Sequence, residues 1–218
     1  MPQTRTLSEQ ASKELLAPYG APVARESLAP DAPAAAAAAA ALGGPVALKL
    51  CGDAIAHKSE RGLVRLGVGA GEVEEVAAAL LAAGRPEDGV TGVLVAEMVA
   101  GHRELLAGTA VDPQFGPTVL LGVGGILAEA VADVTVRVLP IGRVDALEMV
   151  EDLRSQALLG EFRGEPAVDR EAVADVLMAL AEVMADRPDV VSVDLNPLVV
   201  RDGRPVAVDA LVELGTPT

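Results

Sequence analysis

Aromatic side chains are almost absent from this 218-residue sequence, which has one tyrosine, two phenylalanines and no tryptophan. Proteins that bind single-stranded nucleic acid stack the bases on aromatic side chains, and such platforms cannot be assembled here. The formal net charge of −15 argues in the same direction, because binding a phosphate backbone needs clustered cations. We therefore expect no nucleic-acid partner. Any phosphate site must be a small local exception in an acidic surface, which suits a free nucleotide with its magnesium ion.

Cysteine is limited to Cys51, so no intramolecular disulfide can form, and this residue is expected to be a small buried hydrophobe. The first residues lack the apolar core of a signal peptide. The alanine run at residues 34–41 is too short to span a membrane, and it follows the helix-start residues Asp31 and Pro33. We expect a cytoplasmic protein with no membrane partner.

Lysine is also scarce, since only Lys13, Lys49 and Lys58 occur among seventeen basic residues. Two of the three share the block 46–61 with His57, one of two histidines. An ammonium group can sit as a point charge on a phosphate, and a neutral imidazole can act as a base or a nucleophile. The alternative is a solvated loop with unspecialised charges, and the block alone favours neither hypothesis.

The order of predicted elements indicates an α+β fold. A capping-box pattern, Thr6 followed by Glu9, predicts a first helix that ends at Gly20. Apolar periodicity predicts further helices and strands, which are helices at 34–41, 72–83, 144–153 and 170–185 and strands at 45–50, 63–68 and 90–99. Short β-like runs separated by turn residues between 104 and 140 predict an antiparallel sheet. We expect an α/β N-terminal lobe, residues 1–98, and an antiparallel C-terminal lobe with helices, residues 99–218.

A hairpin near the end of the chain makes a geometric prediction. The β-rich runs Val190–Val200 and Arg204–Leu211 are predicted to be its strands. Asp202 and Gly203, which join them, form the strongest short hairpin signal in the sequence, so residues whose numbers sum to 405 should pair. Asn196 would then face Asp209, and Asp194 would lie on the same face as Asn196. Three oxygen-bearing side chains in one place favour a magnesium site that also holds substrate phosphates. The alternative is a polar strip that faces solvent, but the apolar neighbours leave no obvious solvated face.

Several other polar or flexible positions are candidates for a site. Arg137 lies alone in an apolar strand and so should have an anionic partner. Glu104 could bind sugar hydroxyls or cap an exposed strand. The glycines at 122, 124 and 125 could let the backbone approach a phosphate, or could mark bends in a sheet.

Eight motifs occur in an order that resembles a known family. They are Tyr-Gly-Ala-Pro at 19–22, Gly-Pro-Val-Ala-Leu-Lys at 44–49, Ala-His-Lys-Ser at 56–59, Glu-Met-Val at 97–99, Gly-His-Arg-Glu at 101–104, Asp-Pro-Gln-Phe-Gly-Pro at 112–117, Gly-Val-Gly-Gly at 122–125 and Asp-Leu-Asn-Pro-Leu at 194–198, followed by Ala-Val-Asp at 207–209. Together they resemble the ATP-grasp domain, or β subunit, of ADP-forming acyl-CoA synthetases, which are related to succinyl-CoA synthetase. The resemblance covers essentially the whole chain.

The resemblance implies a two-lobed ATP-grasp fold that binds ATP or ADP and Mg²⁺ between its lobes. It implies phosphoryl transfer linked to the formation or cleavage of an acyl-CoA thioester. Residue by residue, it implies that Lys49 contacts the ATP phosphates and that His57 relays the phosphate. It implies that Glu97, Met98 and Val99 form the hinge at adenine and that Glu104 binds the ribose. It also implies that Asn196 and Asp209 hold magnesium, with support from Asp194. Arg137 would join Lys49 and magnesium in neutralising charge on the transferred group.

The same resemblance implies a partner. No CoA-binding segment is visible in the sequence, so the chain should need a CoA-binding α subunit or a fused domain and should form a hetero-oligomer. Relatives generally have paired glycines after His-Lys-Ser-Asp, where this chain has Glu60-Arg61-Gly62, and Arg61 in place of the usual glycine is expected to stiffen the loop or alter its docking. Two alternatives remain open, an ATP-grasp carboxylate ligase without a histidine relay and a non-catalytic nucleotide-binding regulatory subunit.

Overall fold

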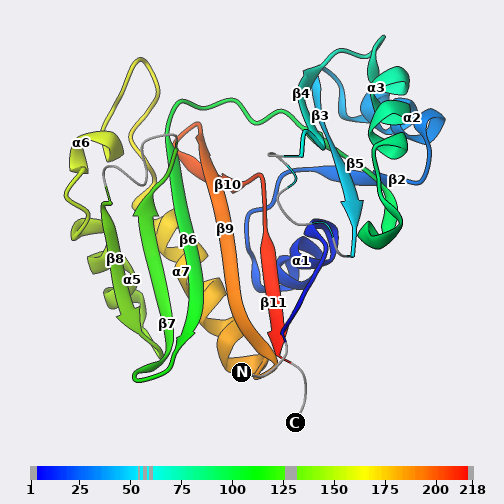
Figure 1. Cartoon of the computed structure of the whole chain (residues 1–218). Coiled ribbons are helices and arrows are strands. Elements are labelled where there is room, and N and C mark those ends of the chain that lie inside the picture. The colour runs from blue at the N-terminus through cyan, green and yellow to red at the C-terminus, as the bar shows by residue number, and fades with distance from the viewer. Residues whose placement is uncertain (1–3, 54, 56–57, 59–60, 126–131, 216–218) are drawn as a thin grey trace. The chain divides into compact units, whose positions relative to one another are not determined.

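The computed structural model describes residues 4–53, 55, 58, 61–125 and 132–215, and these form two compact units (Figure 1). One unit contains residues 6–11 and 24–98, and the other contains residues 4–5, 12–23 and 99–215. The chain passes from the first unit to the second between Met98 and Val99. Residues 4–5 and 12–23 group with the C-terminal residues, so the first helix contributes to both units.

The smaller unit is a four-stranded sheet with the strand order β2-β5-β3-β4, in which every neighbouring pair is antiparallel. Its elements are β2 (Glu26–Ala29), α2 (Ala32–Leu42), β3 (Val46–Gly52), β4 (Val64–Val68), α3 (Val73–Ala82), the 3-10 turn η2 (Pro86–Asp88) and β5 (Val90–Glu97). Buried alanine, valine and leucine side chains of α2 and α3 pack against those of β3 and β5 to form its core. All seven residues of β3 are buried, including Lys49 and Cys51.

The larger unit is built on a seven-stranded sheet with the order β1-β11-β9-β6-β7-β8, in which β10 also pairs with β9. Its elements are β1 (Thr4–Thr6), the part of α1 (Glu9–Leu16) from Ser12 onwards, the 3-10 turn η1 (Ala17–Tyr19), β6 (Glu104–Asp112), β7 (Gly116–Val123), β8 (Val134–Val138), α5 (Arg143–Glu151), α6 (Gln156–Leu159), α7 (Arg170–Asp186), β9 (Val190–Arg201), β10 (Arg204–Ala207) and β11 (Leu211–Gly215). Helices α5 and α7 cover one face of this sheet (Figure 1). In the ranges that the structure describes, we find no helix with the length and apolar character needed to cross a bilayer.

The predicted hairpin register is confirmed. Asp202 and Gly203 both have positive φ, the geometry of a two-residue turn that matches strand twist. Arg204 pairs with Arg201, and the pairing continues to Ala207 with Leu198. Beyond the hairpin, Leu211 pairs with Asp194 in the same register.

One part of the hairpin prediction is wrong, because Arg204–Leu211 is not a continuous strand. Strand β10 ends at Ala207, and β11 begins at Leu211. The N–H of Val208 donates to the carbonyl of Pro197 at 3.2 Å, but proline has no N–H with which to return a bond. The ladder therefore opens at residues 208–210, and Asp209 lies in this opening.

The first helix also begins differently from the prediction. Thr6 belongs to β1, and the hydroxyl of Ser8 accepts a bond from the N–H of Ala11 at 3.3 Å, as an N-cap residue does. Glu9 is thus the first helical residue, and its side chain has other partners. The predicted cap of the alanine helix is confirmed, since Asp31 accepts from the N–H of Ala34 at 2.8 Å.

Candidate functional site

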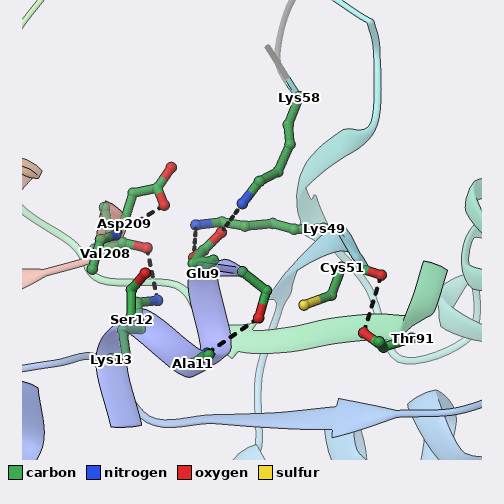
Figure 2. A network of polar contacts seen from close by, with 12 residues as sticks. Glu9, Ala11, Ser12, Lys13, Lys49, Cys51, Lys58, Thr91, Val208 and Asp209 are labelled. Atoms are coloured by element: carbon green, nitrogen blue, oxygen red, sulfur yellow. Dashed lines mark hydrogen bonds and ion pairs between the residues drawn. The ribbon is translucent and has the colours of Figure 1, made fainter. Parts of the chain in front are cut away.

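Two lysines of the smaller unit converge on one carboxylate. The ammonium of Lys49, on β3, lies 2.6 Å from Oε1 of Glu9, and that of Lys58 lies 2.6 Å from Oε2 (Figure 2). The side chains of Glu9, Lys49 and Lys58 are only 1%, 9% and 16% exposed. Buried charges of this kind are stable only when they are paired. Lys49 and Lys58 are therefore paired and largely buried, unlike the solvated, unspecialised charges of the alternative hypothesis.

The oxygen-bearing residues of the hairpin come together in the larger unit. Leu198 pairs with Ala207 and Asp194 pairs with Leu211, with three residues between these pairs on each strand. Asn196 and Asp209 are the middle residues of these two intervals. Asp194 and Asn196 are exposed, and Asp209 is half-buried. Neighbouring protein atoms that displace water from the Asp194 carboxyl group raise its pKa, and the negative charge of Asp209 raises that pKa further.

This donor set fits magnesium. Within the described ranges, no group of three or more histidine, cysteine, aspartate and glutamate side chains is placed to hold a metal ion. A cation at the hairpin would thus be held by Asp194, Asp209 and the amide oxygen of Asn196, and its remaining ligands would come from a substrate or from water. Mg²⁺ is commonly bound in this way, through one or two carboxylates and the phosphates of a substrate. A cation would also offset the repulsion that raises the pKa of Asp194.

Glu104 begins β6 on the same face of the sheet as Asp194. Gly108 pairs with Asp194, and alternation along β6 brings Glu104 to that face about 13 Å farther along the strand. The face opposite carries the buried residues Leu105 and Ala107. The glycines near the end of β7 meet this region, since the Gly124 N–H donates to the Glu104 carbonyl at 2.8 Å. A side chain at Gly124 would lie 2.9 Å from the carbonyl of Leu105, so close backbone approach explains this glycine.

The segment predicted to contact adenine follows β5. Glu97 is the last residue of that strand, while Met98 is exposed and Val99 is half-buried. Glu97 accepts hydrogen bonds from the Arg25 guanidinium at 3.0 and 3.2 Å and from its N–H at 3.1 Å. Its side chain therefore ties β5 to the segment before β2, which leaves the backbone of residues 97–99 as the feature available for an adenine ring.

Arg137 does have the anionic partner that its apolar surroundings predicted. Its guanidinium lies 2.5 Å from the Asp152 carboxylate. Arg137 pairs with the buried Val119, so it lies on the helix-covered face of the sheet, and β8 is three strands away from β9. The structure does not bring Arg137 together with Asp194 and Asp209, which occupy the opposite face.

His57 lies outside the residues that the structure describes, and so does Glu60. Arg61, the departure noted in the sequence, forms a bidentate ion pair with Asp88 at 2.7 and 2.8 Å. These bonds, helped by the N–H of Arg85, lower the pKa of Asp88 to about 2. Arg61 thereby attaches the chain that precedes β4 to the turn that precedes β5. Whether it stiffens the loop stays a prediction.

Replacing Arg61 with methionine should change how stability depends on pH. A carboxyl group whose pKa is lower in the folded chain than in the unfolded chain stabilises the fold above its unfolded pKa, and this contribution is lost as the pH falls through its folded pKa. We expect the wild-type melting temperature to fall between about pH 4 and pH 2. Arg61→Met should melt at a lower temperature than wild type at pH 7, and its melting temperature should fall less across that pH interval. Circular dichroism follows both. Arg65→Met is the matched control, because Arg65 donates only to backbone carbonyls nearby. Identical pH profiles for Arg61→Met and wild type would contradict this account.

A second polar network anchors the beginning of β6. The buried guanidinium of Arg103 donates to the carbonyls of Gly160 and Pro166 and to the carboxylate of Glu165. The ring of His102 lies 2.6 Å from the same carboxylate, and this contact is the main reason why the pKa of Glu165 is lowered. The network fixes the backbone immediately before Glu104.

Comparison with known proteins identifies the fold. The model of the ATP-grasp domain matches residues 2–214. The chain belongs to the ATP-grasp family. It is homologous across nearly its full length to the β subunit of ADP-forming acetate–CoA ligase, being 34% identical to "Acetate--CoA ligase [ADP-forming] I subunit beta" of Pyrococcus furiosus over 95% of this chain and 91% of the relative. As an ATP-grasp chain it also resembles a solved structure from Ca. Korarchaeum cryptofilum, an acetyl-coenzyme A synthetase in complex with coenzyme A and Ca-AMPCP. That match has a TM-score of 0.89 and 32% identity over 96% of this chain and 93% of the other.

Some relatives of this ATP-grasp chain are much longer. "Acetate--CoA ligase [ADP-forming] I" of Archaeoglobus fulgidus is 38% identical over 92% of this chain, but the match spans only 30% of that protein. The α+β class is confirmed for this ATP-grasp fold, which has two antiparallel sheets.

Sequence reasoning did not identify three carboxylates as ion-pair partners. These are Glu9, Asp88 and Glu165, and each holds a basic residue noted in the sequence. Each pair joins residues at least 27 positions apart. The only signal was indirect, since a buried lysine or arginine requires an anionic partner somewhere in the chain.

Proposed function

We propose that this chain is the ATP-grasp subunit of an ADP-forming acyl-CoA synthetase. In this proposal it binds Mg-ATP and relays a phosphoryl group through His57, to or from an acyl-CoA or acyl-phosphate step on a partner subunit. The observation that carries the proposal is the match to separate β subunits over more than nine-tenths of both chains. A fold resemblance alone would not support an activity, because many functions share one fold.

The geometry of each unit supports the binding of a nucleotide. Lys49 would contact phosphate oxygens as a point charge that Glu9 holds in place. Asn196 and Asp209, supported by Asp194, would hold magnesium, which would neutralise the charge that develops on the phosphate oxygens. Glu104 would take the ribose hydroxyls, and the backbone of residues 97–99 would meet adenine.

The proposed transfer is a displacement at phosphorus. A neutral imidazole nitrogen of His57 attacks the γ-phosphorus and forms a P–N bond, while the P–O bond to the β-phosphate breaks and ADP leaves with that electron pair. The phosphoryl group then passes to the partner's acyl site. Related proteins support such a relay. One Ca. Korarchaeum cryptofilum structure has a phosphorylated phosphohistidine segment. In another, the phosphohistidine segment points towards the nucleotide binding site.

The partner is proposed to be a CoA-binding α subunit or a fused domain. The Pyrococcus relative is named a subunit beta, and the Archaeoglobus relative is a longer single chain. A CoA-binding function that is carried by a separate α subunit in one protein and by a fused domain in the other would produce these two arrangements.

The test is labelling with γ-labelled ATP and magnesium, with and without the partner. Wild type should acquire an acid-labile, base-stable phosphoryl label, and His57→Ala should acquire none. His102→Ala is the matched control, because it removes the other histidine and should keep the label. A label that persists in His57→Ala would reject the relay, and histidine-independent turnover with an amine acceptor would favour a ligase of another kind. Binding of Mg-ATP with no phosphoenzyme, even with the partner, would favour a regulatory subunit.

A further inference from the structure

Glu9 joins three separate segments of the smaller unit through one side chain. It is the first residue of α1, Lys49 lies in the middle of β3, and Lys58 lies between β3 and β4. Each carboxylate oxygen bonds one ammonium at 2.6 Å, so the two cations are held next to each other by the two ends of one carboxylate (Figure 2). Such short contacts between full charges are among the stronger hydrogen bonds in proteins.

The charges explain why this arrangement needs a carboxylate. Two ammonium groups at one buried place repel each other, and repulsion is strong where water is largely excluded. A carboxylate between the two ammonium groups offsets part of this repulsion. Without Glu9, we expect at least one lysine side chain to leave the position that it has in the structure.

We propose that Glu9 is a positioning residue, which holds the ammonium groups of Lys49 and Lys58 together so that both can meet the phosphate oxygens of the bound nucleotide. This inference rests on the proposed function, and it deepens that function by adding Lys58 to the phosphate contacts and by assigning Glu9 a role. Glu9 acts through the lysines and does not itself touch the reacting atoms. A preorganised pair of cations needs no rearrangement at the moment of reaction.

The three lysines of the chain allow a direct test that needs no turnover. Wild type with isotope-labelled lysine should give three side-chain NMR signals, which Lys→Arg variants would assign. Glu9→Gln keeps the size of the side chain but loses its charge, and it should shift the signals of both Lys49 and Lys58. Glu14→Gln, an exposed glutamate on the same helix, is the matched control and should leave both signals in place. If Glu9→Gln shifts only one signal or neither, the proposal is wrong.

Titration of wild type with Mg-AMPPCP, an ATP analogue that cannot transfer its phosphate, separates this inference from the proposed function. The analogue should shift both lysine signals as it binds. Binding that leaves the Lys58 signal unmoved would overturn the proposal for the lysine pair while the function stands. Absence of any binding would instead overturn the proposed function, and the titration would show this before any variant is made.

Kinetics distinguish positioning from a purely structural role. Glu9→Gln should lower the rate of phosphoenzyme formation about 10- to 100-fold, as loss of an outer partner commonly does. Its affinity for Mg-AMPPCP should change less than about threefold, because removal of a negative charge near the phosphates offsets the disorder of the lysines. Glu9→Asp has a shorter side chain that keeps the charge, and its rate of phosphoenzyme formation should lie between those of Glu9→Gln and wild type. A lower melting temperature with an unchanged rate per folded molecule would show that Glu9 is only structural.

Discussion

Asp209→Asn is expected to lower magnesium-dependent formation of the phosphoenzyme by at least about 100-fold, since it removes one of two charged ligands from the proposed metal site. Asparagine preserves the size of the side chain and the oxygen that accepts the N–H of Ala210 at 2.9 Å. It also removes the negative charge that raises the pKa of Asp194, so the metal-free fold should lose no stability. Rapid-quench labelling with γ-labelled ATP measures the rate, and circular dichroism measures the melting temperature.

The control for this substitution lies in the same hairpin. Asp202→Asn makes the same chemical change at an exposed turn position, where the backbone φ of 51° is one that asparagine tolerates. It should leave the labelling rate and its dependence on magnesium unchanged. If Asp209→Asn labels within a few-fold of wild type at every magnesium concentration, Asp209 does not hold the metal.

Lys49→Met is the second substitution for which we expect a large effect. It removes the buried ammonium from the middle of β3, and loss of one preorganised cation at developing charge should slow phosphoryl transfer by about two to three orders of magnitude. Methionine is apolar, unbranched and of similar length, so it can occupy the buried position without leaving an unpaired charge there. Glu9 keeps Lys58 as a partner, which limits the cost to the fold.

Lys49→Arg tests whether position matters in addition to charge. A guanidinium keeps the positive charge but is a planar fork that cannot replace a compact ammonium in a buried position. We expect this variant to bind Mg-AMPPCP and to form the phosphoenzyme slowly. Rates equal to wild type in both Lys49 variants would remove Lys49 from the account.

The hairpin illustrates how far the sequence could predict the site. A two-residue turn sets the register, and the pairs on both sides of Asp209 keep the predicted register. The interruption of the strand at 208–210 was missed, although Pro197 signalled it by lacking the N–H that a continuous ladder needs. Local rules thus predicted the register of the hairpin, and they failed where the outcome depended on the partner strand.

Glu9 shows why another part of the site could not be predicted. Its spacing from Thr6 fits a capping box, but Lys49 and Lys58 compete for its side chain and lie 40 and 49 residues away. The same limit applies to Arg137, for which an anionic partner was expected but Asp152 was not identified. A sequence indicates that a buried charge needs a partner, whereas only the fold determines which residue it is.

The central proposal is that this chain binds Mg-ATP through Lys49, Asn196 and Asp209. A crystal structure with AMPPCP and Mn²⁺, whose anomalous scattering locates the ion, tests it most directly. The account predicts a manganese peak bonded to oxygens of Asn196 and Asp209, and a phosphate oxygen within hydrogen-bonding distance of the Lys49 ammonium. A metal held by other residues, or a nucleotide whose phosphates do not meet Lys49, would contradict it.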